Sequence, residues 1–184
     1  MPEATNNSYG SISKVFHWVF AVVIFWQLFT GVNLHNMEFS PQKGQFIWLH
    51  QITGTFLFCF IALRLVWCFY YRPKFEDKLP KTHKIVSKTV HITLYILCLW
   101  LPIQGTMMTW AGGFDVYIIG LIKVPTLLAE NKLMYPTFID IHFISSITLL
   151  LLTMIHILAG FYHRIIINDK HGVWKRMAIN FHSN

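Results

Sequence analysis

Histidines are the residues of this chain whose type and spacing point to chemistry. The sequence holds ten, many for so apolar a chain. His142 and His156 lie fourteen residues apart in one apolar stretch. On a helix, fourteen residues rise about 21 Å and return almost to the same face. One helix is therefore expected to present two imidazoles to the same side, at two different depths.

Each of these imidazoles has a partner at matching depth on an earlier apolar stretch. His50 opens the second stretch near the depth of His142, and His17 opens the first near the depth of His156. Haem b is held by axial ligands alone, and imidazole is a usual axial ligand. The pattern predicts two bis-histidine haem-iron sites, which we call the outer pair (His50, His142) and the inner pair (His17, His156). Cross-helix hydrogen bonding, a bare metal site and a proton relay are the alternatives.

Two further polar residues share these depths. Arg64 follows His50 by fourteen residues and so reaches the level of the inner pair. There it either meets a haem propionate, since a buried Arg needs a counter-charge, or extends to the headgroups. His91 is in excess of the two inner ligands. It either replaces His17 as a ligand or stands beside the inner haem as a proton donor to a quinone.

The elements that must position these residues are long apolar runs. Of the 184 residues, 54% are hydrophobic and 12% charged, against about 25% charged in a soluble domain. Four runs approach the roughly 20 residues needed to cross a bilayer: 15–34, 46–70, 90–110 and 138–166. Because backbone groups in lipid must bond internally, the runs should be helices. The sequence predicts an all-α, integral membrane four-helix bundle forming a single domain, 1–184. The first run is long enough to stay in the membrane, so no cleavable signal peptide is expected.

The charges between the runs set the expected orientation. The net charge is +7, but the basic residues crowd beside the runs and do not spread as a nucleic-acid footprint would. Most of them precede the first run, lie between the second and third, or follow the fourth: Lys14, Arg72, Lys74, Lys78, Lys81, Lys84, Lys88, Arg164, Lys170, Lys175 and Arg176. The two other loops hold only Lys43, Lys123 and Lys132. By the positive-inside rule, both termini are predicted to be cytoplasmic.

The cysteines and glycines inside the runs are expected to serve the packing of the helices. Cys59, Cys68 and Cys98 occur without a CxxC or CxxCH pattern, so neither a disulfide framework nor covalent haem attachment is expected. They should behave as small apolar residues. Glycines in the runs permit close approach of a helix or a ring edge: Gly31, Gly54, Gly105 and Gly160.

The loop at 112–137 is long and partly apolar. It is too short to cross the membrane and return. It is expected either to form a short interfacial helix or to pack on the bundle as a hydrophobic loop. The histidines outside the runs or at their ends, His35, His83, His163, His171 and His182, are expected to be ordinary surface residues.

Taken in order, these motifs resemble the bacterial cytochrome b561 family of small four-helix di-haem inner-membrane cytochromes. The resemblance covers nearly the whole chain and includes His142 and His156 at their fourteen-residue spacing. The remaining motifs are Ser13-Lys14-Val15-Phe16-His17-Trp18, Leu49-His50-Gln51-Ile52-Thr53-Gly54, Leu63-Arg64-Leu65, His91-Ile92-Thr93-Leu94-Tyr95 and Leu101-Pro102-Ile103-Gln104-Gly105. The resemblance implies His17 and His156 as inner haem ligands and His50 and His142 as outer ones. It also implies a quinone, ubiquinone or another, near the inner haem, with His91 as its contact.

The resemblance carries two expectations about function. One member type oxidises superoxide at the outer surface and passes the electron to ubiquinone. It implies an oxidoreductase of the bacterial inner membrane, working between a periplasmic-side donor, with superoxide as a candidate, and the quinone pool. The chain is also similar to the cytochrome subunits of formate dehydrogenases and hydrogenases, which implies an anchor that docks a periplasmic redox partner. A transporter or assembly factor with structural histidines is the non-redox alternative.

Overall fold

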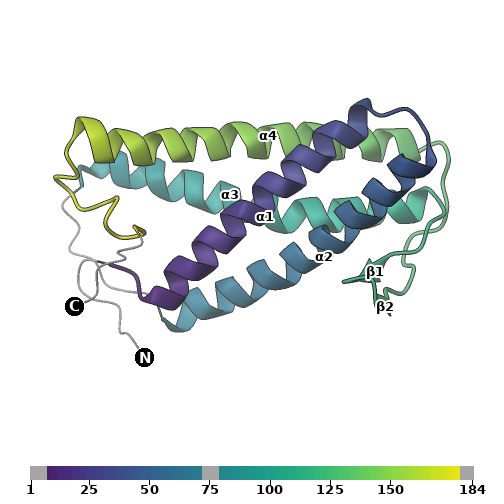
Figure 1. Cartoon of the computed structure of the whole chain (residues 1–184), viewed down its shortest axis with the longest axis horizontal. Helices are drawn as coiled ribbons and strands as arrows, with labels where there is room; N and C mark the ends of the chain where they lie inside the picture. Colours follow the sequence, from purple (N-terminus) through teal and green to yellow (C-terminus); the bar gives the residue numbers. More distant parts are fainter. Residues whose placement is uncertain (1–7, 72–78, 179–184) are drawn as a thin grey trace.

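Four long helices make up most of the computed structural model, which describes residues 8–71 and 79–178 (Figure 1). In chain order they are α1 (Ser11–Asn36), α2 (Pro41–Tyr70), α3 (Lys81–Ala111) and α4 (Tyr135–Phe161), and a π-helical turn (Tyr162–Ile166) continues α4. All four are long and apolar enough to cross a membrane. The predicted all-α, four-helix membrane architecture is confirmed.

The helices begin earlier than the apolar runs predicted. α3 starts at Lys81, nine residues before the predicted span at 90. Its first turns hold Lys81, Lys84 and Lys88, and lysine is a good helix former that lies outside the apolar part detected by a hydropathy pattern. α2 starts at Pro41, where the hydroxyl of Ser40 accepts a hydrogen bond from the Lys43 amide at 3.2 Å. This is a regular N-cap, with Pro in the first turn.

The helices form a ring in chain order. α1 contacts α2, α2 contacts α3, α3 contacts α4 most extensively, and α4 closes the ring against α1. Within the described ranges, the backbones of α1 and α3 do not approach each other closely, and neither do those of α2 and α4. These two pairs lie on the diagonals of the bundle. A side chain on α2 that meets one on α4 must therefore do so through the bundle interior.

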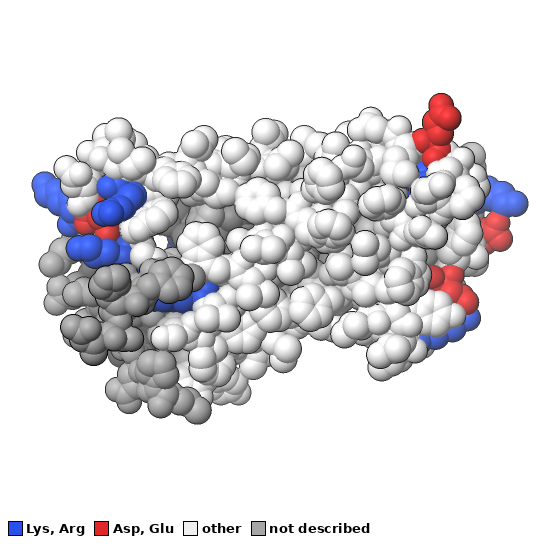
Figure 2. Space-filling model, in the orientation of Figure 1, with Lys and Arg blue, Asp and Glu red and all other residues white. Residues whose placement is uncertain are grey.

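The start of α1 and the segment after α4 lie together at one end of the bundle. The Tyr9 amide donates to the Arg176 carbonyl at 3.1 Å, and the Trp18 indole donates to the Met177 carbonyl at 3.0 Å. Figure 2 shows Lys and Arg gathered at this end, mixed charges at the opposite end, and an almost uncharged flank between them. Such an uncharged band is what a bilayer core requires.

The loop between α3 and α4 contains a small hairpin. Strands β1 (Tyr117–Ile118) and β2 (Ile122–Lys123) pair antiparallel. The turn places Ile119 and Gly120 at positive φ, 51° and 72°. The Ile119 amide donates to the Thr55 hydroxyl of α2 at 3.0 Å, and a β-carbon on Gly120 would lie 2.9 Å from Ile52 Cδ1. The loop packs on the bundle, and the interfacial-helix alternative is wrong, because the hairpin tip fits closely on α2.

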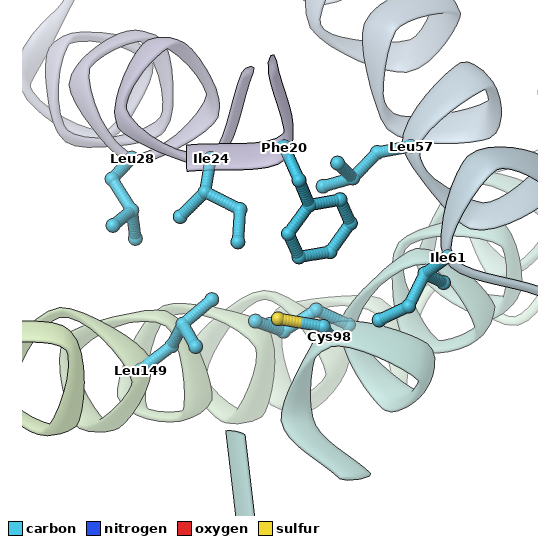
Figure 3. Packing of buried hydrophobic residues seen from close by; sticks show 8 residues of the cluster. Phe20, Ile24, Leu28, Leu57, Ile61, Cys98 and Leu149 are labelled. Carbon is cyan, nitrogen blue, oxygen red and sulfur yellow. The ribbon is translucent and has the colours of Figure 1, made fainter. Parts of the chain in front are cut away.

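An apolar cluster occupies the middle of the bundle (Figure 3). All four helices contribute to it: Phe20, Ile24, Leu28, Leu57, Ile61, Cys98, Leu101 and Leu149. Cys98 is buried in this cluster as predicted, Cys59 and Cys68 are half-buried, and all three are free thiols. On α4, Leu149 lies midway between His142 and His156, so the cluster separates two polar levels.

Candidate functional site

Two pairs of facing imidazoles lie above and below the apolar cluster. The rings of His50 on α2 and His142 on α4 have centroids 6.4 Å apart and planes at 80°. The rings of His17 on α1 and His156 on α4 have centroids 6.2 Å apart and planes at 71°. The structure therefore brings together both predicted pairs.

The separation within each pair suits two ligands of one metal ion. A ring nitrogen binds a metal at about 2 Å, so two imidazoles on opposite sides of one ion have centroids about 6 Å apart. The outer pair joins α2 to α4 across a diagonal of the bundle. A group held by that pair would lie in the bundle interior and not on its lipid-facing surface.

Glycines leave space beside both rings of the outer pair. A β-carbon on Gly31 would lie 3.4 Å from His50 Cε1, and one on Gly105 would lie 3.3 Å from His142 Cε1. A β-carbon at Gly105 would press on the His142 ring, and one at Gly31 would be in van der Waals contact with the His50 ring, so that side chains larger than Ala have little room there. Thus each ring depends on a glycine of a neighbouring helix for its position.

Three histidines meet at the inner level. The ring of His91, on α3, has its centroid 5.1 Å from that of His156, closer than the ring of His17. His91 Nδ1 lies 3.4 Å from the Ser87 hydroxyl, and its side chain remains exposed. The geometry keeps an extra imidazole at the inner level, as the sequence predicts.

Arg64 lies inside the bundle at this level. It is 8% exposed, and its Nε donates to the Tyr95 hydroxyl at 3.1 Å. Within residues 8–71 and 79–178, its Nη1 is enclosed without a hydrogen-bond partner. An enclosed guanidinium needs an anion. Its burial is inconsistent with extension to the headgroups and fits the alternative in which a carboxylate-bearing group meets it.

A second histidine cluster was missed by the sequence analysis. The ring of His163 lies 6.2 Å from that of His83 and 6.5 Å from that of His171. Among the described residues, Nδ1 of His163 is enclosed without a partner. The prediction of an ordinary surface residue is therefore wrong for His163. The available signal was its position two helical turns after His156, on the same face.

This cluster is not a metal site by its geometry. In the described part of the chain, no group of three or more His, Cys, Asp or Glu side chains could hold a bare metal ion. His163 also lies in the π-helical turn, at the end of the bundle where the described chain ends meet. His182 falls outside the described residues.

Comparison with known proteins accounts for these features. A sequence profile described as Prokaryotic cytochrome b561 matches residues 8–178. The chain belongs to the prokaryotic cytochrome b561 family. Cytochrome b561 homolog 2 of Escherichia coli strain K12 is 24% identical to it over 182 residues, covering 94% of this chain and 92% of that protein.

Family membership identifies the chain as a multi-pass b-type cytochrome of the bacterial inner membrane that takes part in electron transfer. The residues of this cytochrome fit haem b. Imidazoles face each other at the separation that an iron requires, and glycines clear space beside the outer rings. Arg64 Nη1 is an enclosed polar atom without a partner among the described residues, as expected where a polar cofactor completes a site.

We expect Gly105→Leu to displace the His142 ring and abolish haem binding at the outer pair. Overpacking beside a buried ring costs about 1–3 kcal/mol. Pyridine haemochrome measurement on the purified protein gives the haem content per chain. Gly44→Leu is the matched control, because no described atom lies within 4 Å of a β-carbon there. Unchanged haem content and spectra in Gly105→Leu would contradict a site at the outer pair.

Proposed function

We propose that this cytochrome carries two haem b groups and transfers electrons across the inner membrane, between a periplasmic-side donor and the quinone pool. His17 and His156 hold the inner haem, and His50 and His142 hold the outer one. The observation that carries the proposal is the pair of ring separations, 6.2 and 6.4 Å, at two levels of one bundle. Haem b, when bound, supplies a one-electron iron couple tuned by its ligands and surroundings.

The charge distribution supports an orientation with both chain ends in the cytoplasm. Basic side chains gather at the end where α1 begins and α4 ends (Figure 2). They include Lys81, Lys84 and Lys88 at the start of α3 and Lys170 and Lys175 after α4. The predicted contributors Arg72, Lys74 and Lys78 lie outside the described residues. In this orientation His17 and His156 are at the cytoplasmic level.

The apolar cluster between the two pairs excludes water from the middle of the bundle. Ile61 is fully buried there, and Leu57, Cys98 and Leu149 are each at most 5% exposed. The two α4 histidines are about 21 Å apart along the helix axis. A dry, packed interval prevents protons from crossing with the electrons, because it offers no chain of polar groups or water to carry them.

Arg64 serves as the counter-charge for a propionate of the inner haem. The support is its burial, its anchoring to Tyr95 at 3.1 Å and the enclosed Nη1. A guanidinium fixed through one nitrogen can direct its remaining donors at a carboxylate. Arg64 thereby neutralises part of the charge that the cofactor brings into the membrane.

His91 acts as the proton-donating contact for a quinone beside the inner haem. Its ring stands 5.1 Å from that of His156, and the ring is exposed at the bundle surface. Quinone reduction takes up protons together with electrons, and an imidazole nitrogen can hold a proton and pass it on. In the alternative, His91 replaces His17 as a ligand, but its ring separation of 5.1 Å from His156 is shorter than the about 6 Å that two ligands on opposite sides of one ion need.

Superoxide is the candidate donor at the outer face. That face carries little free positive charge: Lys123 Nζ lies 2.7 Å from an Asp115 carboxylate oxygen, and Lys132 Nζ lies 3.5 Å from a Glu130 one. The hydrogen bond from Lys123 to Asp115 raises the pKa of that lysine, so it stays charged and paired. Attraction of an anion over long range should therefore be weak.

The paired-site arrangement predicts that the two haems can be removed separately. His156→Ala should lose the inner haem and keep the outer one, because only the inner iron loses a ligand. His142→Ala should do the reverse. Haem content per chain and reduced-minus-oxidised spectra measure both outcomes. Loss of both haems in both variants would replace this arrangement with one in which haem binding and folding are a single cooperative event.

If superoxide is the donor, the purified cytochrome should reduce ubiquinone when supplied with superoxide. Because two of the three outer lysines, Lys123 and Lys132, are paired with carboxylates, the rate should depend only weakly on ionic strength. Superoxide loss no faster than its spontaneous rate would exclude this donor.

His91→Gln should slow quinone reduction while both haems stay bound. Loss of a haem in this variant would make His91 a ligand instead.

A second candidate function is an anchor that docks a periplasmic redox partner. The loop between α3 and α4 favours it, since Leu121, Leu127 and Leu133 are more than 80% exposed. A partner protein should then co-purify in mild detergent, and Leu121→Ser with Leu127→Ser should release it. Purification of the cytochrome alone or as a homodimer would count against this function.

A further inference from the structure

Two polar side chains of α1, Gln27 and Thr30, contact His50 of the outer pair. We call them the polar clamp, and the proposed function gives them no role. Gln27 Nε2 donates to the His50 carbonyl at 3.0 Å. The Thr30 hydroxyl lies 2.8 Å from His50 Nδ1. Gly31 follows directly and leaves the space that the His50 ring occupies. Backbone and ring of His50 are thus both attached to the same turn of α1.

The clamp is itself well fixed. The Thr53 hydroxyl donates to Gln27 Oε1 at 3.0 Å, so both ends of the Gln27 amide are bonded to α2. A β-carbon on Gly54 would lie 2.8 Å from Gln27 Nε2. Gly54 therefore makes room for the amide. Thr30 is 1% exposed, which leaves its hydroxyl no access to solvent.

The hydrogen-bond directions at Thr30 follow from its chemistry. A hydroxyl has one hydrogen to donate and two lone pairs to accept with. The Thr30 hydroxyl lies 2.9 Å from the Trp26 carbonyl and 3.1 Å from the Gln27 carbonyl, and these oxygens only accept. When Nε2 of His50 binds a metal, the ring hydrogen is on Nδ1, which then donates to the Thr30 hydroxyl at 2.8 Å, and the hydroxyl hydrogen is left for one of these carbonyls. His50 is then the Nδ1–H tautomer, with the lone pair on Nε2 available to a metal.

The two imidazoles of the outer pair differ in the hydrogen bonding of their Nδ1 atoms. His142 Nδ1 is enclosed, and within the described residues it has no hydrogen-bond partner. His50 Nδ1 has a short bond to a buried acceptor. An acceptor on the distal nitrogen orients a ligand histidine and makes the metal-binding nitrogen more basic. Only one of the two outer ligands receives this effect from the described chain.

We propose that Thr30 is a positioning residue for the outer site: it sets the tautomer and orientation of His50 and makes Nε2 a stronger electron donor. The inference rests on the proposed role of His50 as an outer haem ligand. A more basic ligand stabilises the ferric form of a bound haem, since it adds electron density to the iron. Thr30 thereby lowers the reduction potential of the outer site relative to a site without the bond.

The test compares Thr30→Val, Thr30→Ser and Thr148→Val in the full-length haem-loaded cytochrome. Val has nearly the shape of Thr but no hydroxyl, and Ser keeps the hydroxyl. Thr148 is the matched control, because its hydroxyl makes the same backbone bond, to the Ile144 carbonyl at 2.9 Å, but lies on an exposed face. Redox titration followed by absorbance and low-temperature electron paramagnetic resonance report on each haem separately.

In Thr30→Val we expect one of two midpoint potentials to move to a more positive value, with a changed resonance signal for that haem alone. Retention of the outer haem should fall about tenfold, the lower range for loss of such a support. Thr30→Ser and Thr148→Val should match the unsubstituted protein. If Thr30→Val loses the outer haem altogether, recovery in Thr30→Ser supports the inference, and loss in both variants overturns it.

The failure of this inference can be told from failure of the proposed function. Unchanged potentials and signals in Thr30→Val, with both haems present, overturn the role of Thr30 and leave the haem sites standing. The His50→Ala variant tests the proposed ligand role of His50 itself. If that variant keeps both haems, His50 is no ligand, and the proposed outer site fails together with the inference.

Discussion

Hydrocarbon offers no hydrogen-bond partners, and this constraint explains where the polar groups of the cytochrome lie. Each polar side chain in the bundle must find its partner on another helix, on its own backbone or on a bound group. The histidines lie in facing pairs at two levels of the bundle, with an apolar cluster between them. The levels can differ in surroundings because the cluster isolates them. Arg64 and Tyr95 serve one level, and Gln27 and Thr30 serve the other.

Family membership and geometry play different parts in the functional argument. The family establishes a membrane b-type cytochrome in electron transfer. Which histidines would hold which haem is inferred from ring separations and from the glycines beside the rings. The diagonal placement of α2 and α4 strengthens the inference for the outer pair, since helices whose backbones do not approach closely in the described chain bring two imidazoles face to face.

The helices and the histidine pairs could be predicted because both follow from local periodicity and a fixed bilayer thickness. Features that depend on how helices are rotated against one another could not. The bond between Thr30 and His50 needs one particular rotation of α1 against α2. The hairpin needs Thr55 as a partner. The spacing of His163 from His156 indicates the face on which it lies, but its contact with His171 depends on the chain turning back after α4, which that spacing does not encode.

The position of α4 in the chain has a consequence for the order of assembly. Both histidine pairs, and so both proposed haem sites, take one histidine from this helix, which is the last of the four to leave the ribosome. During synthesis, a three-helix intermediate holds His17 and His50 without the imidazoles that face them in the finished bundle. Neither site can close around a cofactor before translation has passed His142, and the inner one must wait for His156. Completion of the bundle and completion of the proposed haem sites are thus a single late step in the synthesis of the chain.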